Sequence, residues 1–274
     1  AISGAKEAQF NALNKQAKHL GATTSFTATE VGKAMEYEGM AGWKPKEMIK
    51  GTKGIVNLAA ASGEELGTVS DIVTDGLSAF NMKAKESNRF ADILAATATN
   101  SNTNVSKMGE SFKYAAPVAG TLGYSAEDTG IVLGLMANNG IKESMAGTAT
   151  RSWITRMTKP TKESLAAMEK LGVSLTDSKG KTKDFLTVVE ETRKGFSQLD
   201  SKVEKSKYAK MLAGSAGQSG LLAMVNASES DFKKLKKAIY ECDGAAEEMS
   251  KIKLDNLDGD VKLFTSALEG AGID

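Results

Sequence analysis

The sequence predicts an all-α protein that folds as a compact multi-helix domain. Only three prolines interrupt its 274 residues, aromatic residues make up 6% of it, and residues that favour helices are plentiful. Helix-start signals recur before apolar stretches with helical spacing, at Thr27–Glu30, Ser62–Glu65 and Ser125–Asp128. No linker rich in Pro, Gly or Ser divides the chain, so a single domain is expected and a bilobed form of it stays open.

The first helix is predicted over residues 5–20. One face of it carries apolar residues spaced by three, four and three positions, namely Phe10, Leu13, Ala17 and Leu20. Gly21 is placed to end this helix. The single histidine, His19, would then lie in the last turn, where the helix dipole favours a cation.

Further helices follow, each from an apolar stripe between turn signals. Their predicted ranges are 29–41, 45–61, 64–80, 86–99, 105–115, 125–138, 144–157, 161–171, 184–197, 202–213, 217–227, 229–243 and 245–269. Residues 173–182 alternate as a strand does around a turn at Asp177 to Gly180, which predicts at most a tiny hairpin. The glycines from Gly214 to Gly220 favour a connection between two helices over a hinge or a tight backbone contact.

A weak internal repeat indicates that a helix–turn–helix unit occurs twice. Val31–Tyr37 aligns with Met108–Tyr114, and Ala41-Gly42-Trp43 with Ala119-Gly120 followed by Tyr124. Glycines further along match as well, namely Gly63 with Gly140 and Gly67 with Gly147. Chance similarity between two helical segments rich in Ala and Gly is the alternative, so duplication stays open.

Composition argues against several classes of function. The 35 Lys and Arg residues nearly balance the 34 Asp and Glu residues, whereas a nucleic-acid-binding domain is typically basic. We therefore expect no sequence-specific nucleic-acid binding. One cysteine excludes an internal disulfide, and one histidine leaves a zinc site without its usual ligands. No apolar run approaches the ~18 residues of a membrane helix, and no cofactor is expected.

Some short motifs resemble functional sites but lack the residues that such sites require at fixed positions. Gly180-Lys181-Thr182 resembles the end of a phosphate-binding loop, but the earlier glycine is replaced by Leu175, which favours a solvated turn. Asp255–Asp260 resembles a calcium loop, but Leu254 and Thr265 stand where its first and last carboxylates belong. A Ser-His-Asp triad would have to use His19, and no nucleophile-elbow motif is present. We therefore expect no catalytic, cofactor-binding or metal-binding residues.

Two features near residue 240 have structural interpretations. Cys242 continues the apolar stripe of Phe232, Leu235 and Ile239, which predicts a small buried side chain. Four lysines alternate with this stripe among acidic neighbours, which favours a solvated helix face over an anion site. They are Lys233, Lys234, Lys236 and Lys237.

Several long segments resemble the core region of tail tape measure proteins of long-tailed bacteriophages. They include EVGKAMEYEGMAGWKPKEMI, GIVNLAAASGEELGTVSDIVTDGLSAF, FADILAATATNSNTNVSKMGESFKYAAPVAG, GVSLTDSKGK and GQSGLLAMVNAS. The resemblance predicts a core domain over residues 24–272, with 1–23 as an N-terminal helix leading into it and 273–274 as the end of a fragment. The missing initiator Met agrees with a fragment of a longer protein.

The resemblance implies a structural, non-enzymatic role in tail assembly and tail-length determination inside the tail tube, with release at DNA ejection. It implies tail tube proteins, tail assembly chaperones and tail-tip or baseplate proteins as partners, and homo-oligomers stay open. The virion tail and, during assembly, the host cytoplasm are the implied locations. The resemblance does not distinguish an infectious phage from a prophage or a phage-derived particle.

An alternative from another class is a cell-wall hydrolase module of a tail protein. It would use paired carboxylates such as Glu64 and Glu65, or Asp128, but adjacent residues of a helix cannot face each other across a cleft. A secreted helical toxin is disfavoured because the chain shows no export signal. We also expect a folded element rather than the ruler itself, because frequent helix breaks fold the chain back, with a radius of gyration of about 19 Å.

Overall fold

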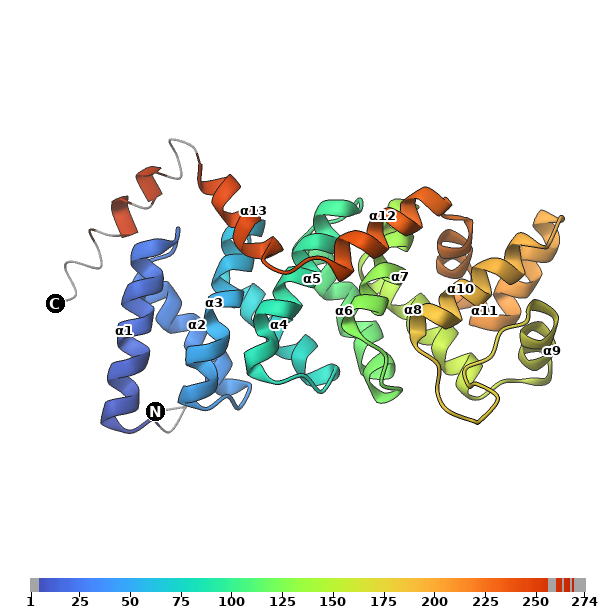
Figure 1. Cartoon of the computed structure of the whole chain (residues 1–274), viewed down its shortest axis with the longest axis horizontal. Helices are drawn as coiled ribbons and strands as arrows, with labels where there is room; N and C mark the ends of the chain where they lie inside the picture. Colours follow the sequence, from blue (N-terminus) through green and yellow to red (C-terminus); the bar gives the residue numbers. More distant parts are fainter. Residues whose placement is uncertain (1–4, 256–259, 263, 267, 269–274) are drawn as a thin grey trace. The chain divides into compact units, whose positions relative to one another are not determined.

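The computed structural model describes residues 5–255, 260–262, 264–266 and 268, and these form α-helices joined by short turns (Figure 1). Within these residues the one extended pairing is an isolated antiparallel bridge between Thr176 and Thr182. The predictions of an all-α fold and of at most a tiny hairpin are confirmed. In the same residues, no helix is long and apolar enough to cross a membrane.

The chain forms two units, and one of them is discontinuous in sequence. Unit 1 comprises residues 1–96 and 242–274, and unit 2 comprises 97–241. The helices that begin in unit 1 are α1 (Glu7–Thr23), α2 (Ala28–Met40), α3 (Pro45–Ser62), α4 (Leu66–Ala79), the 3₁₀ turn η1 (Ala84–Glu86), α5 (Ser87–Asn100) and α13 (Ala245–Leu254). Those of unit 2 are α6 (Val105–Thr121), α7 (Ala126–Asn138), α8 (Glu143–Thr158), α9 (Lys162–Leu171), α10 (Phe185–Ser197), α11 (Lys202–Asn226) and α12 (Glu229–Tyr240).

The start of the chain differs from its prediction in three respects. Gly21 lies inside α1, where a Cβ would come within 2.6 Å of the Ala28 backbone nitrogen, so this glycine permits close packing instead of ending the helix. His19 consequently lies before the last turn of α1. Phe10 is 62% exposed, whereas Leu13, Ala17 and Leu20 are buried as predicted.

Two other signals were misleading. The Ser62–Glu65 sequence does not begin a helix: Ser62 ends α3 and donates its hydroxyl hydrogen to the Ala59 carbonyl, while Glu65 precedes α4. Pro117 does not end α6, which continues to Thr121. By contrast, the Thr27–Glu30 capping box is present, with the Glu30 carboxylate accepting the Thr27 N–H at 2.8 Å.

The glycine-rich stretch after residue 213 joins two helical segments within α11, as predicted, and the break is at Gly214, whose backbone is not helical. Gly214 has φ +67°, and the helix continues on both sides of it. Ser152 donates its hydroxyl hydrogen to the Ala213 carbonyl at 2.6 Å, and Ser164 donates to the Met211 carbonyl at 2.8 Å. Two carbonyls beside the break are thereby satisfied by side chains of α8 and α9. A Cβ on Gly220 would lie 2.4 Å from the Cβ of Ala149 in α8, so this glycine also allows a tight contact between helices.

The internal repeat corresponds to matching turns in the two units. Gly42 after α2 has φ +90° and Gly123 after α6 has φ +75°. The next residue closes each turn: the Trp43 N–H bonds to the Glu38 carbonyl and the Tyr124 N–H to the Ala119 carbonyl, both at 3.0 Å. Gly42 therefore corresponds to Gly123, not to Gly120. The predicted alignment was wrong there because α6 has 17 residues and α2 has 13, a difference of about one turn.

The same correspondence extends to the third helix of each repeat. A Cβ on Gly67 of α4 would lie 3.1 Å from the ring of Tyr37, and one on Gly147 of α8 would lie 2.7 Å from the Cβ of Tyr114. Each tyrosine belongs to the first helix of its repeat. In both units a glycine thus allows the first and third helices of the repeat to approach closely.

Unit 1 is completed by α13, whose N-terminus is held by α5. The Asp92 carboxylate accepts the N–H groups of Gly244 and Ala246, both at 2.9 Å, and Arg89 pairs with Asp243 at 2.7 Å. A carboxylate from α5 therefore caps a helix about 150 residues later in the chain. Burial raises the pKa of Asp92, and the two backbone hydrogen bonds oppose that rise.

Candidate functional site

Two backbone N–H groups of the turn at 177–182 are already occupied by a carboxylate of the same turn. The Asp177 carboxylate accepts the backbone N–H groups of Lys179 at 2.8 Å and Lys181 at 2.9 Å. These bonds hold the pKa of Asp177 below its usual value. Backbone donors that would bind a phosphate are occupied by the protein's own carboxylate, and the residues are exposed, in agreement with a solvated turn.

Metal-ligating side chains do not gather in the part of the chain that the structure describes: no group of three or more His, Cys, Asp or Glu there could hold a metal ion. Most of the calcium-like segment, residues 256–259, lies outside the described residues. The end of the predicted 245–269 helix is also partly outside them. Cys242 is buried as predicted, at 3% exposure, but it follows the end of α12 at Tyr240.

Asp128, one of the carboxylates considered for catalysis, has structural partners. Ser125 Oγ accepts the Asp128 N–H at 3.0 Å, which confirms the helix start. The carboxylate turns away from this cap: Oδ1 accepts the Tyr240 hydroxyl at 2.5 Å and Oδ2 accepts the Leu186 N–H at 3.1 Å. Asp128 is buried and ties α7 to α12 and to the start of α10. Burial, and then this hydrogen bond, raise the pKa of Tyr240 above its usual value.

Glu38 is a fully buried acid of unit 1 that the sequence analysis missed. Its Oε2 lies 2.9 Å from Thr52 Oγ1, and no described group bonds to its Oε1. Burial raises its pKa to about 8. The buried stripe Val31, Ala34 and Met35 reaches position 38 one turn later, and this spacing was a signal that could have identified it.

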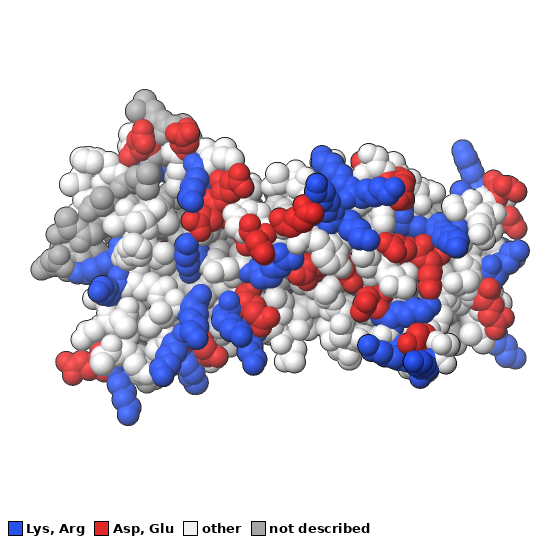
Figure 2. All heavy atoms as spheres, in the orientation of Figure 1, with Lys and Arg blue, Asp and Glu red and all other residues white. Residues whose placement is uncertain are grey.

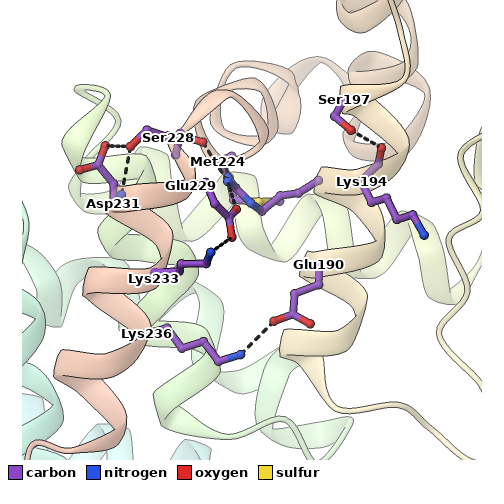
Figure 3. A network of polar contacts seen from close by, with 11 residues as sticks. Glu190, Lys194, Ser197, Met224, Ser228, Glu229, Asp231, Lys233 and Lys236 are labelled. Carbon is purple, nitrogen blue, oxygen red and sulfur yellow. Dashed lines mark hydrogen bonds and ion pairs between the residues drawn. The ribbon is translucent and has the colours of Figure 1, made fainter.

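The lysine cluster of α12 lies on a solvated face, as predicted. Lys233 pairs with Glu229 at 3.4 Å and Lys236 pairs with Glu190 of α10 at 3.0 Å (Figure 3). Lys237 approaches Glu241 at 3.9 Å. Since three of the four charges have carboxylate neighbours, the cluster does not form an anion site.

Arg193 was not singled out from the sequence, although it organises this network. Its guanidinium donates to the carbonyls of Met224 at 2.7 Å and Ala227 at 2.9 Å, at the end of α11. It also lies 3.5 Å from a Glu229 carboxylate oxygen and 4.8 Å from the ring centre of Phe232. One planar cation thus joins α10, the end of α11 and the start of α12.

Concave surface is present in unit 1, in two grooves beside α1. One, between α1 and α2, has a volume of 710 Å³ and includes Phe10, Leu13 and Met35. The other, between α1, α3 and α13, has a volume of 720 Å³ and includes His19 and several lysines. Figure 2 shows charges of both signs interspersed on the surface, so neither sign dominates the face drawn.

Comparisons with known proteins give a consistent result. Residues 14–214 match the model of a family described as phage-related minor tail protein. The chain is 34% identical over its full length to a tape measure protein of Pneumococcus phage Dp-1, of which it covers 24%. It is 31% identical over 97% of its length to a probable tape measure protein of Escherichia phage P2, of which it covers 33%.

The chain therefore spans a quarter to a third of the length of these curated relatives. No solved structure matches it. Because the family model covers most of the chain, including all helices from α2 to α10, the chain belongs to the phage-related minor tail protein family.

Proposed function

We propose that this chain is a structural, non-enzymatic module of a tape measure protein, acting in tail assembly and tail-length determination within the tail tube. The observation that carries the proposal is the alignment of essentially the whole chain with tape measure proteins of two phages. In the proposed role the module occupies the tail lumen or tip of the virion and leaves at DNA ejection. It is present in the host cytoplasm while tails assemble.

The partners that we propose are the tail tube protein, tail assembly chaperones and tail-tip or baseplate proteins, with self-association as a further possibility to measure. Residues 24–272 form the proposed core domain and 1–23 the helix leading into it. The side chains of Asp128 and Arg193 make hydrogen bonds that join one helix to another, and this supports a structural role.

We further propose that this module is a folded element rather than the ruler. A ruler requires a constant rise per residue, as in a continuous helix of about 1.5 Å per residue, or roughly 400 Å for this chain. Its helices instead have 10 to 25 residues, and turns or caps separate them. Contacts between helices then hold the chain folded within each unit.

An in-frame deletion of this region from its parent gene in a phage tests the proposal, with tail length measured by electron microscopy. We expect particles that lack functional tails. Functional tails shorter by roughly 400 Å would show that the region measures length. Normal tails and normal infection would remove the proposed role in assembly.

A zymogram on peptidoglycan tests the hydrolase alternative separately. We expect no clearing from the chain. Clearing that disappears in the variants Glu64→Gln, Glu65→Gln or Asp128→Asn would overturn the non-enzymatic assignment.

A further inference from the structure

A groove in unit 1 combines an apolar floor with exposed cations. It lies between α1, α3 and α13 and has a volume of 720 Å³. Leu20, Ile49 and Leu254 supply apolar surface, and Ile49 is 39% exposed. Gln16 donates its side-chain N–H to the Ile49 carbonyl at 2.9 Å, which ties the α1 wall to the α3 wall. The groove is thereby a defined surface between fixed helices.

The charges along this groove are unevenly matched. Glu247 of α13 accepts from Lys53 at 2.8 Å and pairs with Lys251 at 3.0 Å, so these two lysines share one carboxylate. Lys15 on α1 and Lys50 on α3 are both exposed, and neither has an ion pair with any described residue. The groove therefore presents positive charge beside apolar surface.

Helix α13 itself binds α3 through small buried residues and one carboxylate. Helix α13 buries Ala246 and Ser250 and directs the Glu247 carboxylate to Lys53. Ile49 and Lys50 lie one turn before Lys53 on α3 and offer the same combination of an apolar contact and a cation. At this position, however, both side chains are exposed.

We infer that the groove binds an acidic amphipathic helix of a partner protein, lying beside α13. Its apolar residues, at the i, i+3 or i+4, and i+7 spacing, contact Ile49 and Leu254, while its carboxylates pair with Lys15 and Lys50. The inference goes beyond the proposed function and does not depend on it, because binding of such a helix is measured with the chain alone. Its failure would leave the tail-assembly proposal in place.

A nucleic-acid backbone fits this groove less well. A phosphate chain needs a continuous series of cations and gains nothing from an apolar floor. Here Glu247 lies between two of the lysines, and the chain as a whole has a net charge of +1. A helix that carries both apolar and acidic residues matches both features of the groove.

Fluorescence anisotropy with the 274-residue chain tests the inference. The probe is a labelled amphipathic peptide of about 15 residues, long enough to form a helix when bound, with leucines on one face and glutamates on the other. The comparison peptide has lysine at every glutamate position. We expect the acidic peptide to bind and the basic peptide not to bind at the same concentrations.

Charge reversal then locates the site. The double variant Lys15→Glu/Lys50→Glu should weaken binding of the acidic peptide by about tenfold or more and should gain binding of the basic peptide. Ile49→Ser should weaken binding of the acidic peptide to the otherwise unchanged chain and binding of the basic peptide to the charge-reversed variant. The matched control is Lys33→Glu/Lys85→Glu, which reverses two exposed lysines of unit 1 outside this groove and should leave binding unchanged.

The control variant has the same net charge as the charge-reversed variant, so basic-peptide binding gained only by the latter keeps the test decisive if that variant is less stable. Absence of acidic-peptide binding, or equal binding of both peptides, would overturn the inference. So would equal loss in the control variant. Random-sequence duplex DNA that binds more tightly than the peptide and displaces it would identify a nucleic-acid site instead.

Discussion

The hydroxyl oxygen of Thr52 lies 2.9 Å from a carboxyl oxygen of Glu38, and both side chains are fully buried in unit 1. Thr52 has a single hydroxyl hydrogen, and its oxygen also lies 2.7 Å from the Met48 carbonyl one turn earlier. Its one hydrogen is therefore shared between the Met48 carbonyl and the Glu38 carboxyl oxygen. Burial raises the pKa of Glu38 to about 8, and the hydrogen bond from Thr52 opposes that rise.

Glu38→Gln should stabilise unit 1 near neutral pH. The unfolded-state pKa is 4.5 and the folded-state pKa is about 8, so the contribution of Glu38 to stability is most favourable below pH 4.5 and falls as the pH rises toward 8. Glutamine does not ionise, so the variant should gain about 3 kcal/mol over the wild type at pH 7 and little at pH 4.

Urea unfolding followed by the fluorescence of Trp43, in a Trp153→Phe background, measures this effect in unit 1. The sequence contains two tryptophans, one in each unit. Glu36→Gln, which changes an exposed acid of the same helix, is the matched control and should leave the pH dependence intact. A wild-type stability that does not change between pH 5 and 8 would show that Glu38 is not the buried titrating group.

Tyr240→Phe should destabilise unit 2 by about 1–2 kcal/mol, because the buried Asp128 carboxylate loses its hydroxyl donor. Urea unfolding followed by Trp153 fluorescence in a Trp43→Phe background measures the loss. Tyr208→Phe, for which no hydrogen bond is present among the described residues, should have little effect. Equal effects of the two substitutions would argue against the Asp128 contact.

Arg193→Met should cost unit 2 about 2–3 kcal/mol, since the carbonyls of Met224 and Ala227 both lose a charged donor. Arg193→Lys should recover only part of this loss, because an ammonium group cannot reproduce the planar fork. Lys194→Met is the control: in Figure 3 its side chain points away from the network. Full recovery by lysine would show that the charge alone matters.

Gly147→Ala should destabilise unit 2 by about 1–3 kcal/mol, because its Cβ would lie 2.3 Å from the Ser111 carbonyl oxygen and push α6 and α8 apart. Gly32→Ala makes the same change within α2, where nothing lies within 4 Å, and should stabilise unit 1 by about 0.5–1 kcal/mol. Thermal unfolding measures both. A change in stability of the same sign in both variants would contradict the close-packing role of Gly147.

Local signals in the sequence were sufficient for most helices but not for their ends. Thr27 and Ser125 cap their helices as predicted, because a cap depends on residues three positions apart. Gly21 was misinterpreted because α1 continues past it and packs against the start of α2, where a Cβ on Gly21 would lie 2.6 Å from the Ala28 nitrogen. The helix predicted over 105–115 continues through Pro117 to Thr121. The contact between Gly21 and α2 cannot be read from the residue spacing within α1.

The polar centres were less accessible to prediction for the same reason. Asp92 was not recognised as a cap because the helix it caps begins about 150 residues later. Asp128 was recognised at a helix start, yet its carboxylate bonds to Tyr240. The spacing within one helix indicates which residues share a face, but not which distant donor lies opposite.

The insertion of unit 2 into unit 1 has a consequence for synthesis on the ribosome. The 145 residues of unit 2 (97–241) separate the earlier part of unit 1 from α13. At about 5–20 residues per second, α13 emerges roughly 7–30 s after α5. During that interval the α3 surface and Asp92 are without their α13 contacts, whereas unit 2 is translated as one continuous piece. The nascent chain thus exposes an unfinished first unit while the second is being made, and that interval is when it is most open to chaperones and to premature association.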